Sequence, residues 1–132
     1  MRISTLLLLV PILLTNCKKV ENDNYYLKKV VLVDIIQTSL PKVAIKQRPI
    51  EIYAFAQAEN GCYSKFNFTM NKLTDFNYTL EAEATFETNG TCPTVMTGKD
   101  TTINFIPEKE GIYILNINKK PFKIRSDTVI VK

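Results

Sequence analysis

Three glutamates at spaced positions are the residues of this chain that best suit acid–base chemistry. Glu81, Glu83 and Glu87 share one face of an alternating segment, on which side chains two residues apart lie about 7 Å apart. A glycosidase uses two carboxyl groups about 5–9.5 Å apart, so the spacing suits that reaction. The rest of this face carries Thr and Asn, and no surrounding sequence indicates a pocket. We therefore interpret the glutamates as a solvated strand face that discourages edge pairing, and expect a non-catalytic protein.

The three cysteines are the other reactive side chains, and the chain contains no His. Without His, neither Ser-His-Asp nor Cys-His catalysis is available, and no C-x-x-C pair indicates a redox or metal site. Cys17 belongs to the N-terminal segment, which leaves Cys62 and Cys92 as a pair. The first residues of the chain, described below, predict export, and an even number of cysteines in an exported chain favours a disulfide. This disulfide would close a loop of 31 residues (62–92) and stabilise the fold by about 3.7 kcal/mol.

The overall composition indicates one globular domain. The chain has 132 residues, of which 45% are hydrophobic and 10% aromatic, and a formal net charge of +4. A disordered chain would carry fewer large apolar residues and more net charge, and the length allows one domain at most. The charge is too mild for a protein that binds nucleic acid, so we expect no such partner. We also expect no cofactor and no metal.

The first residues have the pattern of an export signal. Met1-Arg2 supplies a positive charge, and the apolar segment of residues 3–14 is shorter than the ~20 residues that a membrane-spanning helix needs. A basic start, a short apolar core and a polar continuation are typical of a secretory signal peptide. Leu14-Thr15-Asn16-Cys17 then resembles the lipobox of bacterial lipoproteins, of the loose kind found in Bacteroidota. The resemblance implies that residues 1–16 are removed and that Cys17 is acylated as the new N-terminus.

The same segment predicts where the protein resides. Residues 17–26 form a polar tether that begins with Lys18-Lys19 after the cysteine and lacks the acidic run of surface-exported lipoproteins. The resemblance therefore implies a protein held in the outer membrane through acylated Cys17 and facing the periplasm. A plain signal peptide with a chance cysteine near its end, or an uncleaved anchor, are the alternatives.

Residues 27–132 alternate between apolar and polar side chains and show no convincing helical periodicity. In the alternating segment 76–87 Leu80 faces inward. In the segment 62–71 the pattern places Ser64 on the inner face and Tyr63 on the outer face. Seven short segments without a helix predict an antiparallel β-sandwich, with a closed barrel as the alternative. The predicted strands cover residues 27–36, 50–57, 62–71, 76–87, 101–106, 112–118 and 122–131.

The segment from Phe105 to Tyr113 resembles the corner between strands E and F of immunoglobulin-like domains. In that family a Pro and a Gly turn the chain, and a Tyr at the start of strand F hydrogen-bonds back to the corner. The resemblance implies an immunoglobulin-like sandwich in which Gly111 is the turn residue and Tyr113 the corner tyrosine. The antibody pattern Cys…Trp…Cys does not occur, because the chain has no Trp.

Two further features concern modification and partners. Asp100-Thr101-Thr102 and Asp127-Thr128-Val129 look like the acceptor sequence of O-glycosylated exported proteins in Bacteroidota, which implies glycans on Thr101 and Thr128. Tyr53 and Phe55 alternate with apolar residues, so we interpret their segment as a central strand packed on both faces rather than as a sugar-binding surface.

These features favour a binding or structural role in the cell envelope. We expect an accessory module whose partner is an envelope protein or a glycan. An inhibitor or immunity-type lipoprotein, which blocks an envelope-directed hydrolase with the loop Asn89–Lys99, is the alternative. A hydrolase that uses Glu81, Glu83 and Glu87 is the third hypothesis.

Overall fold

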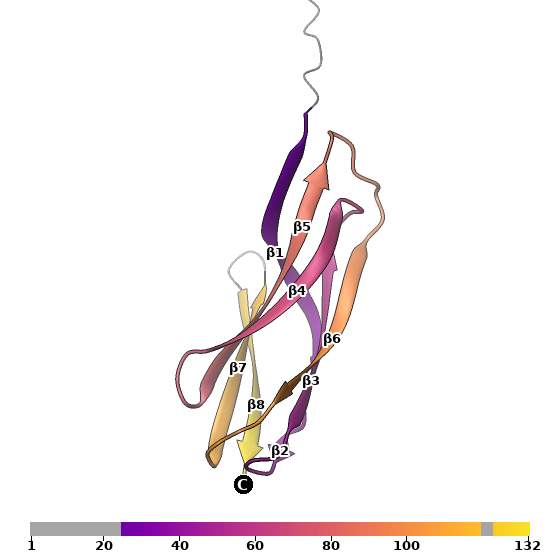
Figure 1. Ribbon diagram of the computed structural model, residues 1–132. Coiled ribbons are helices and arrows are strands. Elements are labelled where there is room, and N and C mark those ends of the chain that lie inside the picture. The colour runs from indigo at the N-terminus through magenta and orange to yellow at the C-terminus, as the bar shows by residue number, and fades with distance from the viewer. Residues whose placement is uncertain (1–24, 120–122) are drawn as a thin grey trace, which may run out of the picture.

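The computed structural model describes residues 25–119 and 123–132, so the segment 1–16, Cys17 and most of the tether lie outside the described residues. The described chain is all-β, as the alternation predicts, and its strands form an elongated, curled sheet (Figure 1). None of the described residues belongs to a helix long and apolar enough to cross a membrane. The strands are β1 (Leu27–Ser39), β2 (Val43–Ala44), β3 (Ile50–Ala58), β4 (Tyr63–Lys72), β5 (Asn77–Thr88), β6 (Thr97–Phe105), β7 (Gly111–Lys119) and β8 (Lys123–Val131).

Parallel and antiparallel pairs occur in the same sheet. Its order is β2-β8-β7-β5-β1-β3-β6, and β4 pairs with β5 as well. The prediction of a purely antiparallel arrangement is wrong, because β5 runs parallel to β7 and β2 runs parallel to β8. Parallel neighbours need a long connection between them, and here the whole of β6 lies between β5 and β7 in the sequence.

The first strand changes its partner half-way along. Residues Leu27–Val33 pair with β5, and Asp34–Ser39 pair with β3, with a register shift between Ile35 and Gln37. In Figure 1 the upper part of β1 lies beside β5 and its lower part continues to the side of β3 and β6. A bulge bends a strand, so this shift helps to curl the sheet around Ile35, which is fully buried.

The core changes in character along the sheet. Small residues on β3 and β5 lie beside β1 and leave room for the buried side chains of Val33 and Ile35. Large aromatic residues fill the other end, where the ring of Tyr113 packs against several neighbouring rings. The small residues are Ala54, Ala56, Ala82 and Ala84, and the rings around Tyr113 are Phe76, Tyr78 and Phe105.

The start of β4 departs from simple alternation. Ser64 pairs with Thr85 and Asn67 pairs with Glu83, so β4 contains one extra residue, and Lys65 has a φ of 51°. The bulge turns Tyr63 toward the core, where its ring meets the Phe86 ring edge-on at 5.0 Å. Ser64 is exposed instead. The predicted faces of these two residues are therefore wrong, because one inserted residue reverses the alternation on one side of it.

Candidate functional site

A hollow of about 460 Å³ lies at the end of the sheet where β1 begins and β5 ends. It is a shallow hollow that is largely open to solvent, and its volume is within the range of sites for small ligands, about 300–1,000 Å³. We call it the stapled hollow, because one wall carries a cysteine of the disulfide. It is lined by Tyr26, Gly61, Cys62, Ser64, Glu87, Thr88, Asn89, Thr91 and Pro93.

The disulfide fixes the rim of this hollow. Cys62 and Cys92 are bonded, with 5.3 Å between their Cα atoms, which confirms the predicted pairing. Beside the bond, the Gly61 backbone N–H donates a hydrogen bond to the Pro93 carbonyl at 2.8 Å. The Thr97 hydroxyl donates to the Asn60 carbonyl at 3.0 Å. The loop between β5 and β6 is thus held at several points against the turn between β3 and β4.

Glu87 is the charged residue of the hollow, and two side chains from the start of the domain hold its carboxylate. The Tyr26 hydroxyl donates a hydrogen bond to Glu87 Oε1 at 2.7 Å, and Lys28 Nζ lies 3.2 Å from Oε2. The Tyr26 hydrogen bond, followed by the Lys28 contact, lowers the pKa of the Glu87 carboxyl. Glu87 therefore presents an ionised carboxylate that accepts hydrogen bonds, whereas a general acid would need a raised pKa.

The three predicted glutamates do not meet at one site. Glu87 lines the hollow, but Glu81 and Glu83 lie further along the outer face of β5 and are not among its lining residues. The Glu81 carboxylate accepts a hydrogen bond from the Asn118 side-chain amide of β7. The arrangement therefore provides no pair of carboxyl groups across a hollow, which glycosidase chemistry needs.

The remaining lining groups suit a ligand rich in hydroxyl groups. They provide alcohols, one amide and an exposed aromatic ring, all of which are able to hydrogen-bond or contact a sugar. These groups come from Tyr26 just before β1, from β4, from β5 and from the loop between β5 and β6 (residues 89–96), which we call the stapled loop. Sequence reasoning identified Glu87 and the cysteines but not Tyr26 or Ser64, because only the pairing of β1 with β5 and the disulfide bring them together.

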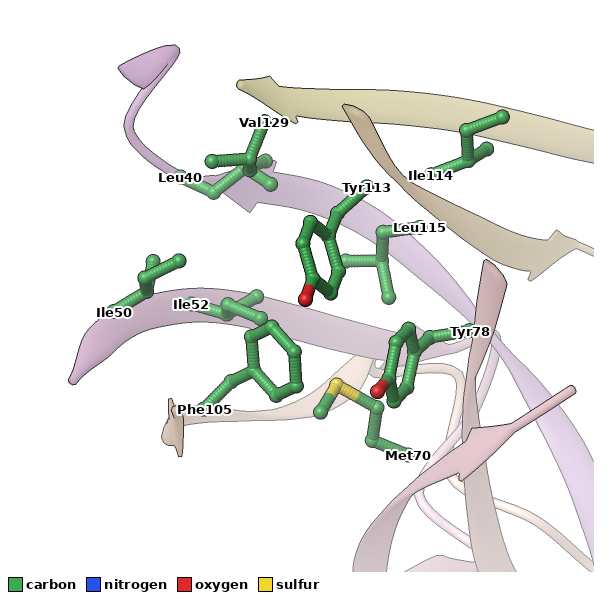
Figure 2. A pocket seen from close by; sticks show the side chains of 10 residues that line it. All are labelled: Leu40, Ile50, Ile52, Met70, Tyr78, Phe105, Tyr113, Ile114, Leu115 and Val129. Atoms are coloured by element: carbon green, nitrogen blue, oxygen red, sulfur yellow. The ribbon is translucent and has the colours of Figure 1, made fainter. Parts of the chain in front are cut away.

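A second cavity lies in the aromatic part of the core, and Figure 2 shows the side chains around it. Its lining is almost entirely apolar, and the Tyr78 and Tyr113 hydroxyls both point toward the Phe105 and Met70 side of it. The volume of about 20 Å³ leaves room for about one water molecule. We interpret this cavity as a packing gap. Its lining residues are Leu40, Ile50, Ile52, Met70, Tyr78, Phe105, Tyr113, Ile114, Leu115 and Val129.

Tyr113 also closes the corner before β7. Its hydroxyl donates a hydrogen bond to the Lys109 carbonyl at 2.9 Å and accepts one from the Lys109 N–H at 3.1 Å. Gly111 has a φ of 147°, and a Cβ at this position would lie 2.7 Å from the Phe76 ring. A glycine is therefore required where the chain turns into β7.

Replacing the corner tyrosine is expected to destabilise the domain without emptying its core. Tyr113→Phe keeps the buried ring but removes both hydrogen bonds with Lys109, so we expect the free energy of unfolding to fall by about 1–2 kcal/mol. Urea denaturation measures this loss. Tyr25→Phe is the control, because the Tyr25 side chain is 62% exposed. Equal stability of Tyr113→Phe and the wild type would contradict the role of the hydroxyl.

Charged side chains fasten the turn after β4 to the same corner. Asp75 Oδ2 lies 2.5 Å from Lys109 Nζ, and Asp75 Oδ1 lies 2.9 Å from Lys72 Nζ. The hydrogen bonds from Lys109 and then from Lys72 lower the pKa of the Asp75 carboxyl from 3.8 to about 2. A lowered pKa means that the folded state favours the ionised form.

The contribution of Asp75 to stability is expected to depend on pH. It is fully present above the unfolded pKa of 3.8 and is lost as the pH falls through about 2. The difference in Tm between the wild type and Asp75→Asn should therefore shrink between pH 4 and pH 2. Asp100→Asn, which removes an exposed carboxylate of β6, is the matched control. A difference in Tm between the wild type and Asp75→Asn that stays constant from pH 4 to pH 2 would contradict the lowered pKa of Asp75.

The structure places the other predicted site residues apart from the stapled hollow. Thr101 is partly buried on β6, and Thr128 is exposed on β8, so their glycosylation stays a prediction. Asp127, which precedes Thr128, accepts a hydrogen bond from the Thr38 hydroxyl at 2.7 Å. Tyr53 and Phe55 are half-buried on the face of β3 opposite to the core.

Comparison of the chain with protein families, with curated protein sequences and with solved structures gives no match. Within residues 25–119 and 123–132, no group of three or more metal-ligating side chains is close enough to hold a metal ion. The interpretation of function therefore depends on the chemistry of the stapled hollow and on the N-terminal sequence.

Proposed function

We propose that the protein is a lipid-anchored, non-catalytic binding module of the bacterial envelope, and that the stapled hollow binds its ligand. The observation that carries this proposal is a hollow of about 460 Å³ with hydroxyl, amide and carboxylate groups on its walls. It lies beside Tyr26, where the tether enters the domain. The lipobox-like residues before Cys17 support an anchor in the outer membrane, on the periplasmic side.

We propose a glycan of the envelope as the ligand. An ionised carboxylate beside several alcohols and one amide offers acceptors and donors for sugar hydroxyls, and the exposed ring of Tyr26 offers a surface for a sugar ring. The separation of Glu81 and Glu83 from this hollow favours binding over hydrolysis.

An immunoglobulin-like ancestry of the scaffold is a further part of the proposal. Antiparallel pairing of β3 with β6 and of β7 with β8 supports it, as does the hydrogen bond of Tyr113 to the corner. The position of β5 between β7 and β1 distinguishes this sheet from a simple sandwich of that type.

The glycan proposal is tested by calorimetry with soluble oligosaccharides released from peptidoglycan and from lipopolysaccharide. Glu87→Gln removes the charge from the acceptor, and we expect at least tenfold weaker binding, because hydrogen bonds to charged groups contribute about 1.5–3 kcal/mol. Glu51→Gln, on the exposed side of β3, is the matched control and should bind like the wild type. No binding by the wild type, or equal affinity of both variants, would overturn the proposal.

One observation favours the inhibitor as a second candidate function. The stapled loop exposes two consecutive apolar side chains, with Val95 57% and Met96 67% exposed. A loop held by a disulfide loses little entropy when it binds, which suits insertion into an enzyme cleft. This candidate predicts inhibition of an envelope-directed hydrolase that Val95→Ser with Met96→Ser abolishes. A panel of such hydrolases that all remain fully active with the wild type would exclude it.

A further inference from the structure

The first strand has a backbone edge without a partner in the described part of the chain. Residues Leu27–Val33 pair with β5 on one side, and pairing with β3 begins only at Asp34. In Figure 1 the upper part of β1 has β5 on one side and no strand on the other. A free edge of this kind presents N–H and C=O groups that are able to pair with another strand.

The pairing of β5 determines the side to which the backbone N–H and C=O groups of β1 point. The Glu87 N–H donates to the Cys62 carbonyl, away from β1. Since backbone groups alternate along a strand, Phe86 and Thr88 point toward β1, where they pair with Lys29 and Leu27. The N–H and C=O groups of the intervening residues, Lys28, Val30 and Leu32, therefore point to the free edge.

The side chains on this edge are apolar. Val30 is 63% exposed and Leu32 is 45% exposed, and both lie on the outer face of β1. A neighbouring strand would cover them, and Val in particular favours strand conformation. The edge thus combines unpaired backbone with exposed apolar side chains.

The other free edges of the described strands, on β4, on β6 and on the part of β8 before Ile130, carry features that oppose pairing. β4 begins with the bulge at Lys65, whose φ is 51°, and its exposed residues are mostly polar. β6 begins with Thr97-Gly98-Lys99-Asp100, which places a glycine and two charged residues on that edge. The part of β8 before its pairing with β2 contains Arg125 and Asp127. Bulges and charged residues protect edge strands from association, so residues 27–33 are the edge best suited to pairing.

We propose that two copies of this chain pair antiparallel through residues 27–33, with Val30 opposite Val30 of the second copy. This register places Lys28 opposite Leu32 and Lys29 opposite Val31, so no like charges face each other. It is a symmetric contact in which the same edge serves both copies. The outer face would then bring two valines and two leucines together in one apolar cluster.

The length of the tether is compatible with two copies on one membrane. In this register the two Leu27 residues lie about 20 Å apart along the strands. The ten residues of the tether, 17–26, span at most about 36 Å, so both N-termini are able to reach the same surface. Anchoring would also raise the local concentration of the chains, which strengthens a weak contact. The pairing itself does not depend on the glycan or on the stapled hollow.

Oxidative crosslinking of the full chain in native membranes tests the pairing. Val30→Cys places two thiols opposite each other, at Cβ distances of about 5 Å, and we expect a covalent dimer under mild oxidation. Ile106→Cys, at a side chain 57% exposed between β6 and β7, is the matched control and should stay monomeric. Equal crosslinking of both variants, or no crosslinking of Val30→Cys, would overturn the proposal.

A second pair of variants distinguishes a specific contact between the two β1 edges from random collision of chains in the membrane. In the Val30→Cys background, Leu32→Lys should reduce the crosslinked fraction at least fivefold, because it places two charges in the apolar cluster. Ile112→Lys makes the same change at a side chain 60% exposed on β7 and should leave crosslinking intact. Loss of crosslinking with both Leu32→Lys and Ile112→Lys, or with neither of them, would also overturn the proposed pairing. The result is independent of glycan affinity, and the acyl group on Cys17 is checked by mass in the same sample.

Discussion

Replacing Cys62 and Cys92 together with Ser is expected to lower the free energy of unfolding by about 3.7 kcal/mol, because the unfolded chain gains the entropy of an open 31-residue loop. A domain of this size loses about 4 °C in Tm for each kcal/mol, so Tm should fall by about 15 °C. Thermal unfolding followed by circular dichroism measures the change. This is a large share of the ~5–15 kcal/mol that stabilises a typical domain.

Two controls separate the effect of losing the disulfide bond from the effect of replacing the Cys side chains with Ser. Treating the wild type with a reductant should produce nearly the same fall in Tm, and the reductant should not affect the double variant. Glycan binding should weaken in the double variant, because Pro93 and Thr91 no longer have a fixed position at the rim of the hollow. An unchanged Tm would show that the loop is held by its hydrogen bonds alone.

Leu80→Ala is expected to lower the free energy of unfolding by about 2–5 kcal/mol, the range for truncating a large apolar side chain in a core. Leu80 is fully buried on β5, opposite Met70 of β4 and Ile117 of β7. Three strands meet there, and pairing on both sides of β5 limits the collapse of the cavity that the variant leaves. Urea denaturation of the wild type and the variant gives the difference.

The control for this variant is Leu73→Ala. Leu73 is 60% exposed in the turn after β4, so its truncation should change the free energy of unfolding by less than about 0.5 kcal/mol. If Leu80→Ala were as mild as Leu73→Ala, the packing of β4, β5 and β7 around Leu80 would be contradicted.

Alternation predicts most of this fold because each strand has one apolar face. The predicted segment 76–87 corresponds to β5 (Asn77–Thr88), and Leu80, which the alternation places inward, is buried together with Ala82 and Ala84 on the same face. The segment 112–118 likewise corresponds to β7 (Gly111–Lys119). The disulfide was also predictable, since the cysteine count leaves one pair.

Alternation does not determine which strands become neighbours. It indicates a face for each side chain, but the parallel pairing of β5 with β7 and the exchange of partners along β1 depend on connections and bulges. The bulge at Lys65 was not predictable either, because a non-glycine residue with positive φ leaves no mark in the hydrophobic pattern. For the same reason the stapled hollow, which needs β1 beside β5, was not visible in the sequence beyond Glu87 and the cysteines.

Mass spectrometry of the protein from native membranes, without reduction, tests the central claim most directly. We expect a diacyl or triacyl adduct on Cys17 as the N-terminal residue, together with linked peptides that contain Cys62 and Cys92. This result would show an exported, lipid-anchored protein with a crosslinked domain. An unmodified Cys17 with free thiols at Cys62 and Cys92 would contradict both the anchor and the compartment, and the thiols would then become the leading functional site.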